Sequence, residues 1–368
     1  MTKQTALYAQ HEALGASFLD FGGWQMPLKY RSELDEHHTV RRTAGIFDLS
    51  HMGEVLVSGP QAAGFLNYAL VSNLAVVAIG KAKYSLICNA EGGVIDDLIV
   101  YRLAEERFLV VPNAGNADSV AEQLRIRADG FDVAVEDQSE GTALIAVQGP
   151  TAEAILLAMA APEAAASIAG LRYYAAVEVE LAGLPVLLAR TGYTGEDGFE
   201  IFIGGPFAVR LWNAAMEAGR EHGLMPCGLA SRDSLRLEAG MPLYGHELGL
   251  DTNPFEAGLG PVVSLKKTED FVGRSVLEPL KGQEPGRRLV GLQGSGRRSA
   301  RAGYDVVVDG SVVGTVTSGL PSPTLGYPVA LAYVEASLAV PGTEVSVDLR
   351  GRPEPFTVVE TPFYRRQK

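Results

Sequence analysis

Two adjacent aspartates, Asp96 and Asp97, interrupt an apolar segment with the sequence GGVIDDLIVY (residues 92–101). The two glycines favour a sharp turn, and the apolar residues around the acids predict a strand. Neighbouring side chains of a strand point to opposite faces, so we expect one carboxylate to face inward among apolar groups. An ionised carboxylate without a partner is costly there. The inward aspartate is therefore either satisfied by backbone amides or available as an acid or base for a ligand nitrogen.

A second segment of interest, RTGYTGEDGFE (residues 190–200), carries three glycines within seven residues. It lacks the lysine of a phosphate-binding loop, and its glycine spacing does not fit a dinucleotide-binding loop. Glycine-rich turns also allow the backbone to approach a flat ligand. In that interpretation Tyr193 and Phe199 stack on a ring and Glu200 hydrogen-bonds to it. The alternative is that the segment is only the turn of a hairpin.

A third segment, GLASRDSLRLEAGMPLYGHEL (residues 228–248), begins with the pattern of a helix. Ser231 or Asp233 would cap this helix, which we expect to end near Gly240. Arg232 is unusual in this place, because the N-terminal end of a helix favours negative charge. It indicates a fixed ion pair or an anionic ligand, with a surface salt bridge as the alternative.

Histidines and cysteines give weaker signals. We interpret His37 and His38, in a charged helical stretch, as solvated, and His51, at the border of a strand, as structural. Their spacing predicts no metal site, and no GxSxG motif is found in the sequence. Cys88 and Cys227 lie far apart and outside any CxxC pair, which indicates a reducing compartment and no disulfide.

The bulk composition excludes several classes of protein. The net charge of −13 argues against a nucleic-acid-binding protein. The apolar runs are shorter than the ~18–20 residues that a membrane span needs, and the N-terminus does not have the pattern of a signal peptide. We therefore expect a cytoplasmic protein without a membrane partner. The segment 281–301 contains six basic residues and one acid, and is either a solvated turn region or a docking edge for an acidic partner.

These motifs need a mixed scaffold of strands and helices. Strand patterns occur at residues 53–59, 107–112, 131–137, 143–150 and 199–203, and a hairpin is predicted around Ala182-Gly183-Leu184. Helices are predicted after Gly59-Pro60, after Asn116 or Asp118, and after Pro206. Residues 266–288 have the composition of a linker. Beyond them the pattern is all strand, with turns at Asp309-Gly310 and Gly351, as expected of a small barrel.

Taken in order, the motifs resemble those of the glycine cleavage T-protein family. The segments that carry the resemblance span almost the whole chain: DFGGWQMPLKY (20–30), GIFDLSHMGE (45–54), AKYSLICNAEGGVIDDLIVY (82–101), ALIAVQGP (143–150), RTGYTGEDGFE (190–200), CGLASRDSLRLEAGMPLYGHEL (227–248), TNPFEAGL (252–259), TSGLPSPTLGYPVALAYV (317–334) and PFYR (362–365).

The resemblance implies an α+β, multi-domain T-protein-like fold. In it, ferredoxin-like mixed α/β domains and a small C-terminal β-barrel surround a central folate channel. The expected domains are residues 1–50 with 138–240, residues 51–137 with 241–280, and residues 281–368. It further implies an aminomethyltransferase of the glycine cleavage system, which moves a one-carbon unit from aminomethyl-dihydrolipoyl H-protein to tetrahydrofolate. The products are 5,10-methylenetetrahydrofolate, ammonia and dihydrolipoyl H-protein.

The resemblance also assigns roles to residues. The key aspartate of the family corresponds to Asp97, the pterin-binding glutamate to Glu200 and a ligand-binding arginine to Arg232. Further substrate-contacting or folate-contacting positions correspond to Asn113, Tyr193, Tyr101, Met52, Tyr364 and Arg365. The family uses tetrahydrofolate as a co-substrate and the lipoylated H-protein as its partner, and needs no metal, flavin or nucleotide.

Two related functions are the alternatives. One is the folate-binding module of a demethylating dehydrogenase or oxidase, but this chain has no room for a flavin domain and no GxGxxG after an early strand. The other is a non-enzymatic folate-binding protein of iron–sulfur or tRNA maintenance. Its characteristic KGC-like cysteine has no counterpart in KKTEDFVGR (266–274).

Overall fold

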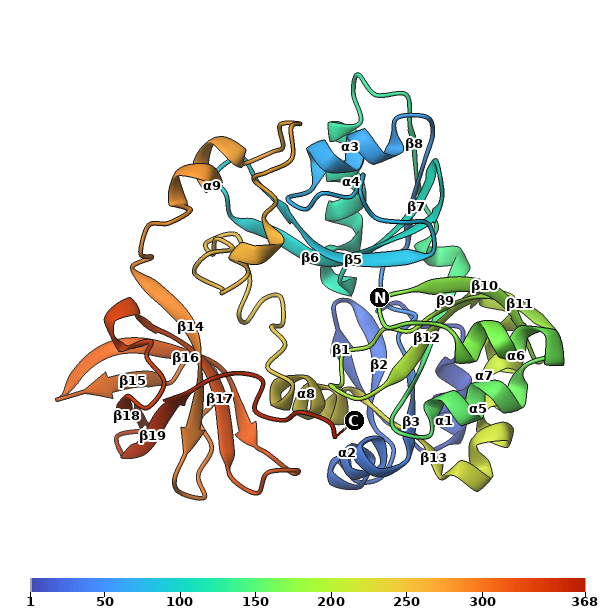
Figure 1. The fold of residues 1–368 in the computed structure, drawn as a ribbon. Helices are drawn as coiled ribbons and strands as arrows, with labels where there is room; N and C mark the ends of the chain where they lie inside the picture. Colours follow the sequence, from blue (N-terminus) through green and yellow to red (C-terminus); the bar gives the residue numbers. More distant parts are fainter. Residues whose placement is uncertain (1, 368) are drawn as a thin grey trace. The chain divides into compact units, whose positions relative to one another are not determined.

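The computed structural model describes residues 2–367 (Figure 1). The chain forms two compact units. Unit 1 comprises Met1–Ala69, Asn73–Tyr84 and Leu98–Arg232, and unit 2 comprises Leu70–Ser72, Ser85–Asp97 and Asp233–Lys368. The division into three domains expected from the sequence stays a prediction.

A six-stranded sheet organises much of unit 1. In spatial order its strands are β10 (Ala176–Leu181), β11 (Leu184–Ala189), β12 (Gly198–Gly204), β9 (Thr142–Gln148), β3 (Ala44–Asp48) and β13 (Leu224–Pro226). All neighbours are antiparallel except β13 and β3. The predicted hairpin is confirmed, since Ala182 and Gly183 both have positive φ, as a tight two-residue turn requires.

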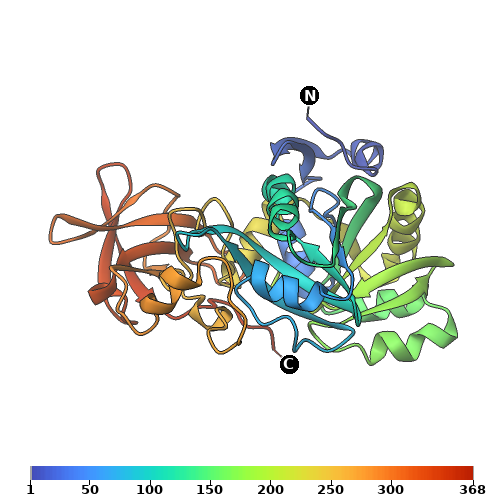
Figure 2. The ribbon, with the colours of Figure 1, turned by 90° about the horizontal axis from the view of Figure 1, so that it is seen from above.

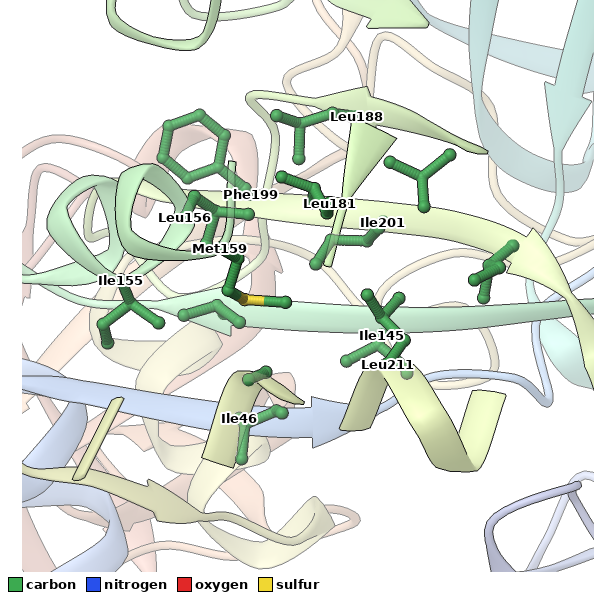
Figure 3. Close-up of a cluster of buried hydrophobic side chains, with 14 of the residues drawn as sticks. Ile46, Ile145, Ile155, Leu156, Met159, Leu181, Leu188, Phe199, Ile201 and Leu211 are labelled. Atoms are coloured by element: carbon green, nitrogen blue, oxygen red, sulfur yellow. The ribbon is translucent and has the colours of Figure 1, made fainter. Parts of the chain in front are cut away.

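A large apolar core of unit 1 lies between this sheet and three helices. These helices are α5 (Ala152–Met159), α6 (Pro162–Ala169) and α7 (Ala208–Gly219). Figure 3 shows Ile145 and Ile201 from the sheet together with Ile155, Leu156 and Leu211 from the helices, all fully buried. Helix α7 follows Pro206, as the sequence predicts. The short 3-10 helix after α7 ends at Gly223, which has a left-handed conformation.

A five-stranded sheet carries the first acidic motif. Its spatial order is β5 (Lys81–Cys88), β6 (Val94–Ala104), β7 (Arg107–Val111), β4 (Val55–Ser58) and β8 (Ala134–Asp137). Helix α4 (Ala117–Arg127) contacts β8 of this sheet, and helix α3 (Ala62–Ala69) contacts α4 (Figure 1). The predicted strands are confirmed, although the last one begins at Ala134 rather than at residue 131. Unit 1 also contains α1 (Tyr8–Ala13), β1 (Ser17–Phe21), β2 (Trp24–Lys29) and α2 (Glu33–Arg42).

Unit 2 contains the predicted barrel, drawn in orange and red (Figure 1, Figure 2). Its strands close in the order β14 (Arg287–Gly294), β17 (Pro328–Glu335), β16 (Ser311–Pro321), β15 (Asp305–Val308), β18 (Glu344–Asp348) and β19 (Pro353–Val359). The turn at Asp309-Gly310 is confirmed, with φ of 50° and 79°. Pairing of β19 with β14 closes the sheet around a core that includes Leu292, Val316 and Phe356.

Residues 266–288 are more ordered than the predicted linker. They contain helix α9 (Arg274–Leu280), and Phe271 and Leu277 are buried. The Lys267 ammonium is buried as well and donates hydrogen bonds to the carbonyls of Leu70 and Ser72, at 2.7 and 3.0 Å. These few residues anchor the segment to the rest of unit 2, although its composition is mostly polar.

Helix α8 (Leu229–Glu238) begins earlier than predicted. Ser231 therefore lies inside its first turn, where the hydroxyl donates to the carbonyl of Gly228 at 2.9 Å. The amide of Gly228 donates to the carboxylate of Glu36, at 2.8 Å, so a residue remote in sequence satisfies the helix start.

The prediction that His37 is solvated was wrong. Helix α2 packs on β3, and the His37 ring is completely buried.

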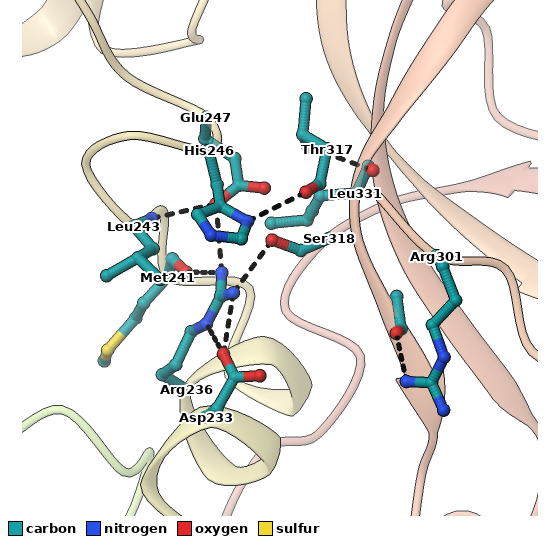
Figure 4. Close-up of polar contacts among 11 residues, drawn as sticks. Asp233, Arg236, Met241, Leu243, His246, Glu247, Arg301, Thr317, Ser318 and Leu331 are labelled. Atoms are coloured by element: carbon teal, nitrogen blue, oxygen red, sulfur yellow. Dashed lines mark hydrogen bonds and ion pairs between the residues drawn. The ribbon is translucent and has the colours of Figure 1, made fainter. Parts of the chain in front are cut away.

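Unit 2 contains a buried ion pair between Arg236 and Glu247 (Figure 4). The Arg236 guanidinium donates to Glu247 at 3.0 Å, to Asp233 at 2.8 Å and to the Ser318 hydroxyl at 2.8 Å. Glu247 also accepts from the amide of Leu243 at 2.9 Å. Both partners of the pair are essentially inaccessible to solvent, so each buried charge depends on the other for its stabilisation.

We predict that Arg236→Met lowers the free energy of unfolding by about 3–5 kcal/mol, because Glu247 would remain buried as an unpaired charge. The double variant Arg236→Met/Glu247→Leu should recover most of that loss. Urea unfolding followed by circular dichroism measures both. Arg298→Met, which removes an exposed pair with Glu354, is the matched control and should cost at most about 1 kcal/mol. Equal losses in the single and double variants would contradict the assignment.

Candidate functional site

The loop between β11 and β12 is held by ion pairs on both sides. Arg190 pairs with Asp197 through two hydrogen bonds, one of them 3.0 Å from Nε to Oδ1. Arg41 of α2 pairs with Glu196 at 3.0 Å in a buried position. Both ends of the glycine-rich segment are therefore fixed before it leads into β12.

The glycines of this loop make room for Gln148. A Cβ atom at Gly192 or Gly198 would overlap the side chain of Gln148, which is fully buried at the end of β9. The Gln148 amide donates to the carbonyl of Thr191 at 3.0 Å and accepts from the Thr194 hydroxyl at 2.9 Å. At these two positions, glycine thus allows the backbone to approach a side chain of the protein's own core. From the sequence alone, a flat ligand was also possible.

Glu200 extends from β12 into a buried polar cluster. Its side chain is only 8% exposed and accepts hydrogen bonds from the hydroxyls of Thr191 and Tyr101, the latter at 3.4 Å. The same two hydroxyls lie 2.9 Å apart. Burial, and next the charge of Glu200, raise the pKa of Tyr101 well above its ordinary value, so this phenol stays protonated as a donor. Both hydrogen bonds reach the same oxygen of Glu200, Oε2.

Arg232 lies against Tyr193, with its guanidinium 4.8 Å from the ring centroid. Burial lowers the pKa of Arg232, while the negative charge of Glu200 opposes that shift. Within residues 2–367, no carboxylate lies within ion-pair distance of this guanidinium, so neither the fixed ion pair nor the alternative surface salt bridge is found, and an anionic ligand stays a prediction. The structure therefore brings four predicted site residues, Glu200, Tyr101, Tyr193 and Arg232, into one cluster of unit 1.

A cavity of about 560 Å³ in the same unit is lined by Met52 and His51. His51 is 2% exposed, lies edge-on to Phe21 at 5.5 Å, and its Nδ1 has no hydrogen-bond partner within the described chain. Burial, helped by the positive charge of Arg232, lowers the pKa of His51 to about 4. The sequence pointed only to a structural histidine here. Asn113 precedes Ala114, which lines the same cavity.

The two acids of β6 belong to unit 2. Asp96 is completely buried, on the face that also carries Val94, whereas Asp97 is half-buried on the other face. The alternation expected of a strand is confirmed, and it is Asp96 that takes the inward position. Both carboxylates lie close to Tyr244, whose pKa is raised by burial and then by their charges. Asp97 is thus the more accessible acid of the pair.

The C-terminal residues Tyr364 and Arg365 also belong to unit 2. The amide of Tyr364 donates to the carbonyl of Glu238 at 2.8 Å. The carboxylate of Glu238 is itself held by Ser322 and Thr324, the latter at 2.7 Å from its hydroxyl. Tyr364 is half-buried and Arg365 is exposed.

Two family matches cover most of the chain. The GCVT N-terminal domain matches residues 7–267, and the glycine cleavage T-protein C-terminal barrel domain matches residues 287–365. The chain belongs to the glycine cleavage T-protein family. The interval between the two matches contains α9, and the second match contains the closed barrel.

Similar proteins match over nearly their full lengths. The aminomethyltransferase of Streptomyces avermitilis is 58% identical and that of Streptomyces coelicolor 55%, each over 100% of this chain and 98% of the relative. The crystal structure of the glycine cleavage system aminomethyltransferase T from Bartonella henselae has a TM-score of 0.92 and 38% identity, with 100% of both chains covered. The predicted fold class is confirmed as a mixed α/β, multi-domain T-protein fold with a C-terminal barrel. The predicted function, aminomethyltransferase of the glycine cleavage system, is confirmed too.

Residues 2–367 contain neither a metal-binding cluster nor a membrane-spanning helix. No cluster of three or more histidine, cysteine or acidic side chains has an arrangement that could hold a metal ion. No helix in this part of the chain combines the length and apolar character needed to cross a bilayer.

We predict that His51 makes stability depend on pH. Its pKa is about 4 in the folded chain against 6.5 for an ordinary histidine, so the neutral form is favoured by folding. This contribution is complete above pH 6.5 and is lost as the pH falls toward 4. One pKa unit corresponds to ~1.4 kcal/mol, so the loss reaches about 3 kcal/mol.

Urea unfolding of the wild type and of His51→Gln at pH 7.5 and pH 4.5 measures this effect. The wild type should lose about 2–3 kcal/mol more than the variant between these pH values. Parallel losses in the two proteins would show that His51 does not titrate in this way.

Proposed function

We propose that this chain transfers the one-carbon unit of aminomethyl-dihydrolipoyl H-protein to tetrahydrofolate. The products are 5,10-methylenetetrahydrofolate, ammonia and dihydrolipoyl H-protein. The observation that carries the proposal is the cluster of Glu200, Tyr101, Tyr193 and Arg232 in unit 1, in a chain of the T-protein family. Tetrahydrofolate supplies the nucleophilic nitrogens when bound.

Glu200 has the chemistry to bind the edge of a pterin. A 2-amino-4-oxo pterin presents two adjacent N–H donors, which a carboxylate accepts as a charge-assisted pair. The hydroxyls of Thr191 and Tyr101 both bind Oε2 of Glu200 and hold its orientation. Arg232, held over the Tyr193 ring, contributes a positive charge for a ligand oxygen.

Asp97 is the residue that we propose to orient the reacting nitrogens and to accept a proton from the attacking one. Its half-buried position on β6 supports contact with a ligand, in contrast to the enclosed Asp96. An ordinary aspartate is a weak base, with a pKa of roughly 3.9. Asp97 would therefore contribute mainly by placing its carboxylate correctly beside the attacking nitrogen. The rest of the acceleration would come from holding the two substrates in attack geometry.

The remaining positions complete the proposed ligand contacts: Asn113, Tyr101, Met52, Tyr364 and Arg365. We also propose a cytoplasmic location, because Cys88 and Cys227 are buried thiols that do not form a disulfide, which fits a reducing compartment.

The carrier protein is the proposed partner, and the basic segment 281–301 is its proposed docking edge. Two of its arginines are already engaged, Arg287 with Glu256 and Arg298 with Glu354, each at 3.3 Å. Both of these pairs are partly exposed, and such pairs contribute little to stability, so they leave the arginines available for exchange with an acidic partner.

We predict that Asp97→Asn folds normally and lowers turnover by about 10²–10⁴-fold, because a positioned proton acceptor is lost. The measurement is ammonia release from aminomethylated H-protein with and without tetrahydrofolate. The same assay on the wild type tests the proposed function, since release should require tetrahydrofolate. Asp97 has no such role if the variant keeps near-full activity, and Asp309→Asn, in an exposed turn of the barrel, is the control.

We predict that Glu200→Gln weakens tetrahydrofolate binding by roughly 10–100-fold, which corresponds to ~1.5–3 kcal/mol for a hydrogen bond to a charged group. The amide accepts with one oxygen only and carries no charge. Titration calorimetry measures the affinity, and circular dichroism checks the fold. An unchanged dissociation constant would rule out the pterin pairing.

A further inference from the structure

A second cavity in unit 1, of about 520 Å³, is lined by none of the predicted site residues. Its walls come from two sheets. Leu56 of β4 and Leu109 of β7 belong to the five-stranded sheet, and Val186 of β11 and Phe202 of β12 belong to the six-stranded sheet. These side chains give the cavity an apolar lining on which a hydrocarbon or aromatic body can pack.

Glu54, which immediately precedes β4, lines the cavity and has an unsatisfied side chain. It is 1% exposed, and neither carboxyl oxygen has a hydrogen-bond partner within the described chain. Its main chain, in contrast, is fully engaged: the amide donates to the Ser139 hydroxyl at 2.9 Å and the carbonyl accepts from the amide of Gln138 at 2.8 Å. Buried carboxyl groups are normally hydrogen-bonded, so this one lacks a donor.

The charges around the cavity are mostly negative. Burial, and next the charge of Asp137, raise the pKa of Glu54 well above its ordinary value, so this carboxyl ionises only when a positive group lies beside it. Glu178 and Glu180 of the edge strand β10 also line the cavity. Arg107 is the one base among the described lining residues, and it already pairs with Glu178 at 3.3 Å. A positive ligand is therefore favoured over a negative or neutral one.

We propose that this cavity is a binding site for a small organic cation, namely a primary ammonium group carried on an apolar body. The ammonium would donate to Glu54, whose carboxyl has no donor among residues 2–367, and the body would pack on the leucine, valine and phenylalanine side chains. The site is separate from the aminomethyl transfer proposed above, because it shares no residue with the Glu200 cluster or with Asp97.

The test uses the full-length protein with benzylammonium as the probe and benzyl alcohol as its neutral counterpart, both by titration calorimetry. Wild-type protein should bind benzylammonium saturably at one site, and benzyl alcohol at least 10-fold more weakly. Glu54→Gln should weaken benzylammonium binding roughly 10–100-fold, because a charge-assisted hydrogen bond becomes a neutral one. Its affinity for benzyl alcohol should stay the same.

Glu180→Gln is the matched control, because it removes an exposed carboxylate from the same cavity wall. It should change the affinity by less than about 5-fold, as expected for a solvent-screened charge. Circular dichroism should show that both variants are folded. Aminomethyl transfer should stay unchanged in Glu54→Gln, so its outcome is distinguishable from a failure of the proposed function. Absence of benzylammonium binding to the wild type, or equal binding by Glu54→Gln, would overturn the proposal.

Discussion

The arrangement of the Glu200 cluster depends on one buried amide. Gln148 sits at the end of β9 without contact with solvent, where its polar atoms must be hydrogen-bonded. The carbonyl of Thr191 and the hydroxyl of Thr194 meet that requirement, and both lie on the loop that precedes β12. The loop can come this close only because residues 192 and 198 are glycines. A core amide thereby determines the path of the loop and the start of the strand that carries Glu200.

Local sequence patterns predicted most of the elements but not their tertiary contacts. The hairpin at Ala182-Gly183 and the barrel turn at Asp309-Gly310 were predictable, because positive φ at both positions of a turn has a clear residue preference. The start of α8 was not, since the group that binds its first free amide is Glu36, 192 positions earlier. His37 was likewise interpreted as solvated, because its burial comes from packing on β3.

The candidate site shows the same limit. Alternation along β6 predicted that one of two neighbouring acids faces inward, but only the sheet's packing selects Asp96 for that position. The proximity of Arg232 to Tyr193 was equally hidden, since nearly forty residues separate them in the chain. Their roles came from the family resemblance, which rests on motifs spread over the whole sequence. His51, whose Nδ1 has no partner in the part of the chain that the structure describes, had no distinguishing local pattern.

The order of strands in the six-stranded sheet has a consequence for self-association. A sheet that ends in an open strand offers unpaired amides and carbonyls to another copy of the chain. Here one end is β10, whose exposed Glu178 and Glu180 would place like charges side by side if two such edges met. The other end, β13, is only three residues long and finishes with Pro226, which has no amide hydrogen to donate. Both margins of the sheet thus discourage continuation into a fibre.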